Sequence, residues 1–299
     1  MASTQRRSIV CFLCTGLWIS IFNSGAARGL EFSCPKDVDP CSASVLWLTG
    51  EIVDGDAARL AAVLKQRGPV VSLVVLADSV GGNGEEAWKI GRLLRKLRLM
   101  TAIGSAVASQ APTALKGSSP VIYYPEAGVA AHGSGVVVPS LDFRKAVCAS
   151  ACVDIWLGGY YRFGDAYLAV HRPVMVTNPG TPTTEPLKTL DDEVARWAAY
   201  DAEMGAPDSL LALSMQVPNS KFKLLDRSYI QHSLLGRSIS DEFWMAVDCG
   251  TGFPDTLDVW KGTIGFDAIA TLSRCAADHL KEQRIRAWSS LSAAADAAP

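Results

Sequence analysis

Two hydrophobic periodicities alternate along the first hundred residues of the chain. Residues 45–52 form a short apolar run typical of a strand, and residues 54–66 place apolar side chains on one face of a helix. Residues 70–76 are almost wholly apolar, as in a strand buried on both faces. A second amphipathic helix over residues 85–97 and a strand over residues 100–103 follow. These successive β-α-β units predict an α/β fold with a largely parallel sheet and right-handed crossovers.

The pattern is interrupted in the middle of the chain and then resumes. Residues 104–145 are rich in Gly, Ser, Pro and Ala, and we interpret them as an insertion with short strands at 121–124 and 136–138. From Val147 the sequence predicts a helix of small residues, two short strands, and a further helix over residues 187–203.

The N-terminus has the order of a secretory signal peptide. Arg6 and Arg7 precede an apolar stretch over residues 8–22, and small residues follow at 23–27. A membrane span needs roughly 20 predominantly apolar residues, and this run is shorter. We therefore expect cleavage near residue 27, a periplasmic or secreted protein, and no stable membrane anchor after cleavage.

This division gives three parts. Residues 1–27 are the predicted signal peptide, residues 28–240 a globular domain, and residues 241–299 a C-terminal extension. An Ala/Ser/Asp tail begins at Ser289, and for it we predict disorder.

Composition and charge exclude some partners. The 299 residues are 49% hydrophobic and 19% charged, which suffices for a sizeable core. The formal net charge is -2, from 28 Lys and Arg against 30 Asp and Glu. Loss of the signal peptide, with its two arginines and no acid, makes the charge more negative. A chain without a basic field is not expected to bind nucleic acid.

The chain has 8 cysteines, of which Cys11 and Cys14 lie in the signal peptide. An even number in an oxidising compartment predicts disulfides, although six thiols allow 15 pairings. The six that remain are Cys34, Cys41, Cys148, Cys152, Cys249 and Cys275. Proximity favours a bond between Cys34 and Cys41. The four histidines do not stand at ligand spacing with these cysteines, so we expect no metal site.

A glycine-rich loop has two interpretations. Residues 82–87 fit the G-x-G-x-x-A pattern between a strand and a helix, which is the context of a dinucleotide site. Glu85 and Glu86 would stand where the pyrophosphate lies, and the next strand ends in Gly104 without an acid to hold a ribose. An oxyanion site formed by this loop is the stronger hypothesis.

Ser150 and His171 are the candidate nucleophile and base. Ser150 stands where a strand is expected to turn into a helix, which would expose its hydroxyl and aim the next backbone N–H at the same point. His171 follows a predicted strand, at a position where a base could reach Ser150. Each residue also has a structural alternative: Ser150 as an ordinary N-cap, and His171 as a packed histidine.

The order of four motifs resembles the ClpP/crotonase superfold, and within it the secreted or periplasmic Clp-protease-like proteins of bacteria. The motifs are DSVGG at 78–82, CASAC at 148–152, GGYYR at 158–162 and VHRP at 170–173. The resemblance extends over residues 45 to 240, with 104–145 as an insertion relative to the family pattern. It implies repeated β-α-β units around a largely parallel sheet.

The resemblance also implies roles for particular residues. It makes Ser150 the nucleophile, His171 the general base, and the backbone N–H groups of Gly81 and Ala151 the oxyanion hole. The third member of the triad would be Asp226, where the match to the family is poor. Three other acids compete for that role: Asp191, Asp192 and Asp201.

Cys148 and Cys152 flank Ser150 and depart from the ordinary peptidase pattern. Four residues apart on a helix, they would share a face, and a disulfide between them would need an adjusted backbone. Two small buried residues that pack the helix are the alternative. Neither thiol is favoured as the nucleophile, because thiols are readily oxidised in an oxidising compartment.

These observations predict a secreted serine hydrolase, most simply a peptidase acting on a peptide or protein substrate, with no cofactor. The resemblance further implies a homo-oligomer. A noncatalytic binding or assembly protein on the same fold is the main alternative, because one fold hosts many functions. A dinucleotide-binding protein is the lesser alternative.

Overall fold

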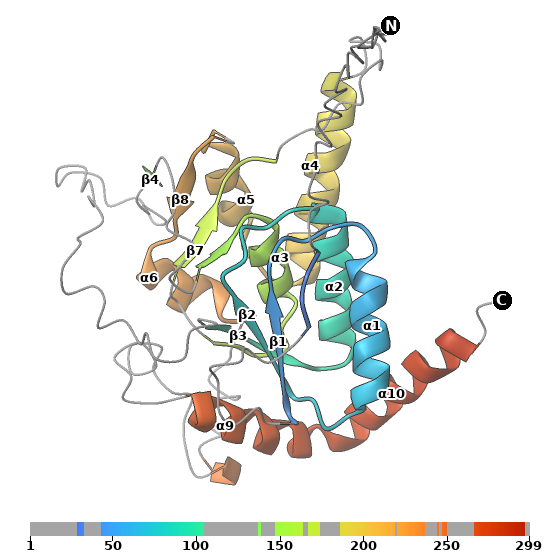
Figure 1. The fold of residues 1–299 in the computed structure, drawn as a ribbon. Coiled ribbons are helices and arrows are strands. Elements are labelled where there is room, and N and C mark those ends of the chain that lie inside the picture. Colours follow the sequence, from blue (N-terminus) through green and yellow to red (C-terminus); the bar gives the residue numbers. More distant parts are fainter. Residues whose placement is uncertain are drawn as a thin grey trace, which may run out of the picture.

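The computed structural model describes several stretches of the chain, with gaps between them (Figure 1). The described residues are 29–32, 43–104, 137–138, 147–163, 167–173, 186–218, 220–236, 244, 247–249 and 266–296. Three of the predictions lie outside them: the signal peptide, the Cys34–Cys41 pair and the strand at 121–124.

The first half of the fold is a parallel sheet made of β-α-β units. Its elements in chain order are β1 (Val45–Thr49), α1 (Asp56–Arg67), β2 (Leu73–Ala77), α2 (Gly84–Lys96) and β3 (Met100–Gly104). A fourth strand, β6 (Arg162–Phe163), pairs with β3 and gives the order β1-β2-β3-β6. All three pairings are parallel. The prediction of an α/β fold with a parallel sheet is confirmed for this part.

A second, mixed sheet has the order β4-β8-β7-β5. Its strands are β4 (Val137–Val138), β5 (Val147–Ala149), β7 (Tyr167–Val170) and β8 (Phe222–Leu224). β5 and β7 are parallel, whereas β8 runs antiparallel to both β7 and β4. The two adjacent short strands expected after the small-residue helix therefore belong to different sheets, because β6 pairs with β3 and β7 pairs with β5.

Helices cover both faces of the first sheet. Side chains alternate between the two faces along the strands. Leu46 and Val74 pack against α1, α2 and α3 (Ala151–Leu157) on one face. Trp47 and Val75 pack against α9 (Phe266–His279) on the other. In Figure 1 the red helices α9 and α10 (Lys281–Asp296) lie below the strands. Burial on both faces explains why the strand over 73–77 shows no polar position.

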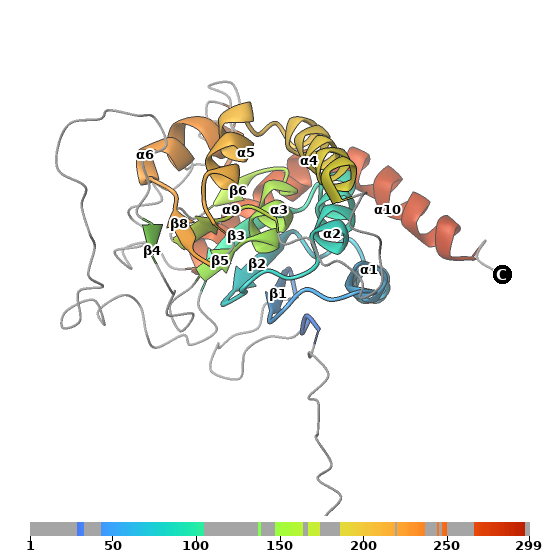
Figure 2. The same ribbon diagram turned by 90° about the horizontal axis from the view of Figure 1, so that it is seen from above.

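The remaining helices lie beside α3 and the second sheet. They are α4 (Pro186–Glu203), α5 (Asp208–Met215), α6 (Arg227–Tyr229) and the π-helical segment Ile230–Leu234. Seen from above, α4 lies next to α2, and α5 and α6 lie beside β8 (Figure 2). The predicted helix over 187–203 is confirmed.

The C-terminal region is docked onto the rest of the fold. The buried Arg284 of α10 donates hydrogen bonds to four backbone carbonyls at the ends of α2 and before β2, namely Leu97, Arg98, Pro69 and Val71. A disulfide joins Cys249 to Cys275 of α9.

The predicted disorder from Ser289 is wrong as far as Asp296, because this segment continues α10. Alanine has the highest helix propensity, and Leu291 packs against the core.

Candidate active site

Ser150 occupies a sharp turn between β5 and α3. Its backbone angles are φ 55° and ψ -129°, a conformation that residues with a Cβ seldom adopt. The Ser150 N–H donates to the Ala169 carbonyl and the Val153 N–H donates to the Ser150 carbonyl, both at 2.8 Å. Backbone held in this way against its preference is concentrated at functional sites, which makes the turn a candidate active-site feature.

The Ser150 side chain does not cap α3, although the residue stands at the N-cap position. For a serine at the start of a helix, a capping hydroxyl is the ordinary expectation. Here the residue is half-buried and its side chain makes no capping hydrogen bond. The hydroxyl is therefore not committed to the helix end, and the structural alternative for this residue loses its main support.

Gly81 brings the loop between β2 and α2 (residues 78–83), which we call the glycine loop, directly against this turn. A Cβ on Gly81 would stand 2.7 Å from both the Ala149 carbonyl oxygen and the Ser150 Cβ, and 3.0 Å from the Ala151 nitrogen. Its φ of 96° suits glycine. The Gly81 N–H donates a long hydrogen bond of 3.3 Å to Ser79 Oγ. The two predicted oxyanion donors and Ser150 are thus gathered at one place.

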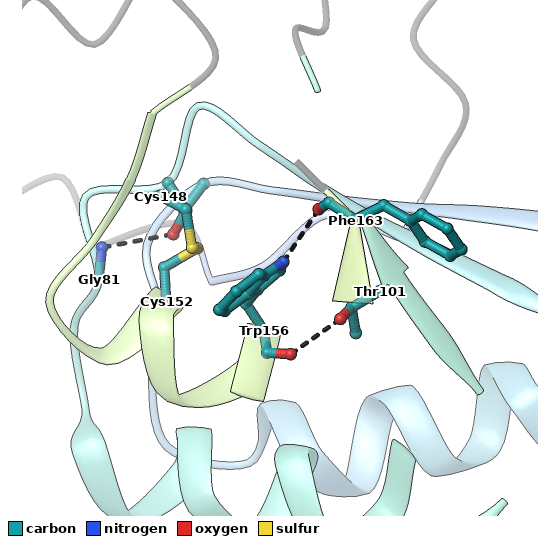
Figure 3. The surroundings of a disulfide bond; sticks show 8 residues. Gly81, Thr101, Cys148, Cys152, Trp156 and Phe163 are labelled. Carbon is teal, nitrogen blue, oxygen red and sulfur yellow. Dashed lines mark hydrogen bonds between the residues drawn. A yellow bond between two sulfur atoms is a disulfide. The ribbon is translucent and has the colours of Figure 1, made fainter. Parts of the chain in front are cut away.

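A disulfide between Cys148 and Cys152 spans the turn at Ser150 (Figure 3). Both half-cystines are fully buried. The expected obstacle to this bond does not arise, because Cys148 lies in β5 and only Cys152 is helical. With both sulfurs in a disulfide, neither cysteine is available as the nucleophile.

His171 lies at the end of β7 and is 9% exposed. Its Nδ1 is 2.6 Å from the Arg172 carbonyl oxygen. Since a carbonyl only accepts, Nδ1 carries the proton of the neutral ring, and the lone pair lies on Nε2. Burial lowers the pKa of His171 below its ordinary value, and the bond to the Arg172 carbonyl opposes this effect. The ring also packs edge-on against Phe222. Near neutral pH this imidazole is therefore uncharged, and its Nε2 can accept a proton.

The sheet brings Ser150 and His171 to the same edge. β5 and β7 are parallel neighbours, with Ala149 opposite Ala169. Ser150 follows its strand directly, and His171 comes two residues after Ala169, so both leave the carboxyl ends of adjacent strands. Among the described residues, however, no hydrogen bond joins the Ser150 hydroxyl to His171. Catalytic hydrogen bonds are often longer in a free enzyme than in its complexes.

The structure does not bring Asp226 to His171. In the antiparallel register of β7 and β8, His171 continues toward Phe222, whereas Asp226 continues past Leu224 toward the start of β7. The offset of four residues corresponds to about 13 Å. Asp226 Oδ1 instead accepts from the N–H and hydroxyl of Ser228, chiefly the hydroxyl, and these bonds lower its pKa. The position on His171 that an acid would occupy is taken by the Arg172 carbonyl.

The other candidate acids lie on α4. Asp191 and Asp192 are exposed, whereas Asp201 is buried, and within the described part of the chain neither of its carboxylate oxygens has a hydrogen-bond partner. Burial raises the pKa of Asp201 to about 7, and the Arg162 guanidinium opposes the rise. Asp201 is coupled to Asp154, which lies one turn beyond Ser150 on α3.

Asp154 is a buried acid that the sequence analysis did not single out. Its carboxylate accepts from the indole N–H groups of Trp88 and Trp197, and its backbone carbonyl accepts from the Tyr200 hydroxyl. Burial, with a contribution from Asp201, raises its pKa well above the usual range. A detectable signal existed in the sequence: one acid inside the apolar run at 151–157.

The start of α2 is not arranged to receive a phosphate. Asn83 caps the helix by accepting from the Glu86 N–H, and the Asn83 carbonyl accepts from Ala87. Glu86 then binds the Ala57 N–H and pairs with Lys89. The helix end is therefore occupied by its own side chains and flanked by carboxylates, which works against the dinucleotide hypothesis.

Two searches of the described residues gave negative results. No group of three or more His, Cys, Asp or Glu side chains is arranged to hold a metal ion within this part of the chain. Among the helices of the same stretches, none combines the length and apolarity of a membrane span.

Comparisons with known proteins add little to this geometry. No protein-family model and no curated protein matches the chain. A solved structure, a serine-to-alanine mutant of the membrane-bound stomatin-specific protease 1510-N, shares 13% identity at a TM-score of 0.38. The match covers 69% of this chain and 84% of that one. A likeness this distant carries no argument, so the functional interpretation rests on the site itself.

Proposed function

We propose that this chain is a serine hydrolase of the ClpP/crotonase superfold that works outside the cytoplasm and cleaves peptide bonds. The observation that supports this most strongly is the conformation of Ser150. A residue with positive φ, a hydroxyl that does not cap the helix and a glycine backbone packed against it fits a nucleophile better than it fits a structural serine.

In the proposed reaction Ser150 Oγ attacks the acyl carbon of the substrate while His171 Nε2 takes the hydroxyl proton. The N–H groups of Gly81 and Ala151 hold the oxyanion that develops. The Gly81 N–H would exchange its long bond to Ser79 for this stronger acceptor. His171 then gives the proton to the leaving amine, and water releases the acyl group by the reverse sequence.

The Arg172 carbonyl supports the base in place of a carboxylate. It fixes the tautomer in which Nε2 is free to accept, which is one of the two tasks of a triad acid. The other task, stabilising the imidazolium, is done less well by a neutral carbonyl than by a charged acid. We therefore expect slower turnover than a complete Ser-His-Asp triad would give.

The location outside the cytoplasm rests on two features. The N-terminal segment resembles a signal peptide, and both disulfides of the described residues are typical of an oxidising compartment. A homo-oligomer and a peptide substrate follow only from the family resemblance and are part of the proposal.

Hydrolysis of an unfolded polypeptide such as casein, followed by mass spectrometry of the products, tests the proposal. Ser150→Ala is the informative variant, and Ser289→Ala, the same change at an exposed position in the middle of α10, is the matched control. We expect the first to lose several orders of magnitude in rate and the second to match the wild type. Equal rates for Ser150→Ala and wild type would exclude Ser150 as the nucleophile.

A noncatalytic binding protein on the same fold is the second candidate. It is favoured by the Arg172 carbonyl on His171 Nδ1 and by the distance of Asp226. A folded wild-type protein that hydrolyses neither polypeptides nor activated esters would decide for this candidate.

A further inference from the structure

The Cys148–Cys152 disulfide stands symmetrically around Ser150, two residues to either side. Its first half-cystine lies in the middle of β5, a strand of three residues, and its second lies in the first turn of α3, a helix of seven. The two Cα atoms are 5.2 Å apart. The covalent bond therefore closes the strand-to-helix turn at its base, and Ser150 is the apex of that turn.

Besides the disulfide, the described contacts that hold this turn are two backbone hydrogen bonds and the packing of Gly81 against it. A residue with a Cβ prefers negative φ, so Ser150 tends to relax away from φ 55°. The hydroxyl of Ser150 adds no cap bond. The two backbone hydrogen bonds, from Ser150 to Ala169 and from Val153 to Ser150, would both be broken by that relaxation.

Each end of the disulfide is anchored in a different layer of the fold. Cys148 is paired with Leu168 of β7 and bridged to Ser79 in the glycine loop. Cys152 is fully buried in the core cluster that α3 shares with α2. The bond thus ties β5, which is bridged to the loop after β2, to the helix that presents the Ala151 N–H.

We propose that the Cys148–Cys152 disulfide is a positioning element for the active site, which holds Ser150 at positive φ so that its hydroxyl and the Ala151 N–H point to the same place. Its effect on catalysis rests on the proposed hydrolase function, whereas its effect on the turn does not. The disulfide takes no part in bond making or breaking during the reaction.

The test compares the full-length double variant Cys148→Ala, Cys152→Ala with the control Cys249→Ala, Cys275→Ala, which removes the other described disulfide. Amide hydrogen exchange at Ser150 and Val153 reports on the turn directly. The rate of labelling by a fluorophosphonate reports on the nucleophile. We expect exchange at these two amides to rise at least tenfold and labelling to slow at least tenfold in the first variant, with neither change in the control.

A rescue variant separates positioning from general stabilisation. Glycine has no penalty at positive φ, so adding Ser150→Gly to the double variant should return exchange at Val153 to within about threefold of wild type. A sulfur that merely filled the core would not be replaced in this way. If the double variant fails to fold but the triple variant folds, the positioning role is supported; if neither folds, it is excluded.

Unchanged exchange at Ser150 and Val153 in a folded double variant would overturn the proposal. If exchange rises as expected but wild type itself is never labelled, the hydrolase function fails while the positioning role stands. The two failures are therefore distinguishable.

Discussion

Gly81 packs so closely on Ser150 that a Cβ added to the glycine would stand 2.7 Å from the Ser150 Cβ. This contact joins two loops that are far apart in the sequence, one after β2 and the other after β5. It places the Gly81 backbone against the strained turn that carries Ser150, and the proposed oxyanion hole depends on it.

Gly81→Ala should remove activity by crowding the oxyanion site. The new Cβ would meet backbone of the Ser150 turn, so we expect kcat/KM to fall at least about a hundredfold. Gly55→Ala is the matched control, because Gly55 also has positive φ but nothing lies within 4 Å of its added Cβ. Both variants should lose about 1 kcal/mol of stability from backbone strain, and Gly81→Ala should lose more because of the clash, as measured by urea unfolding. Equal activities in the two variants would show that Gly81 is not part of the site.

Substitutions at Ser150 should abolish activity without lowering the free energy of unfolding. Because Ser150 is held at φ 55°, Ser150→Gly should raise the free energy of unfolding by about 1 kcal/mol, whereas Ser150→Ala keeps the Cβ and should change it by less than about 0.5 kcal/mol. Both variants should be inactive. Denaturant unfolding gives the comparison. A glycine variant less stable than the alanine variant would mean that the turn is not strained in solution.

His171 should set the acid limb of the pH-rate profile. Burial lowers its pKa below 6.5, and only the neutral ring accepts the Ser150 proton. The labelling rate should therefore rise with pH, through a midpoint below 6.5, and then stay level to pH 8. A midpoint at pH 7 or above would contradict the buried position of the ring.

Asp201 should make the fold less stable as pH rises from 5 to 8. Its pKa is raised to about 7, whereas in the unfolded chain it ionises near pH 4, so between these values the folded state binds the proton more tightly. Over this window we expect Asp201 to contribute a loss of about 2–3 kcal/mol to the pH dependence of wild type, from the integrated linkage relation. The free energy of unfolding, measured in urea at each pH, gives this loss.

Asp201→Asn should lack this part of the loss. Its stability relative to wild type should improve steadily with pH, whatever constant offset the amide itself introduces at pH 5. Parallel pH profiles for the two proteins would mean that Asp201 is ionised or solvated throughout.

The local β-α-β pattern predicted β1 through β3, α4 and the strand-to-helix turn at Ser150, because each depends on short-range periodicity. A Cys148–Cys152 bond would be difficult if both residues were helical, and the turn between strand and helix removes that objection. The direction of β8 decides where Asp226 lies, and the direction of a strand depends on long-range pairing that no local pattern encodes. The helix over 289–296 depends on its docking in the same way.

Covalent labelling tests the central claim most directly. Wild-type protein treated with a fluorophosphonate should gain the mass of one phosphonyl group, and peptide mapping should locate it on Ser150. Ser150→Ala, folded and as stable as wild type, should gain none. Labelling of a different residue, or a folded wild-type protein that remains unlabelled at pH 8, would contradict the assignment of Ser150 as the nucleophile.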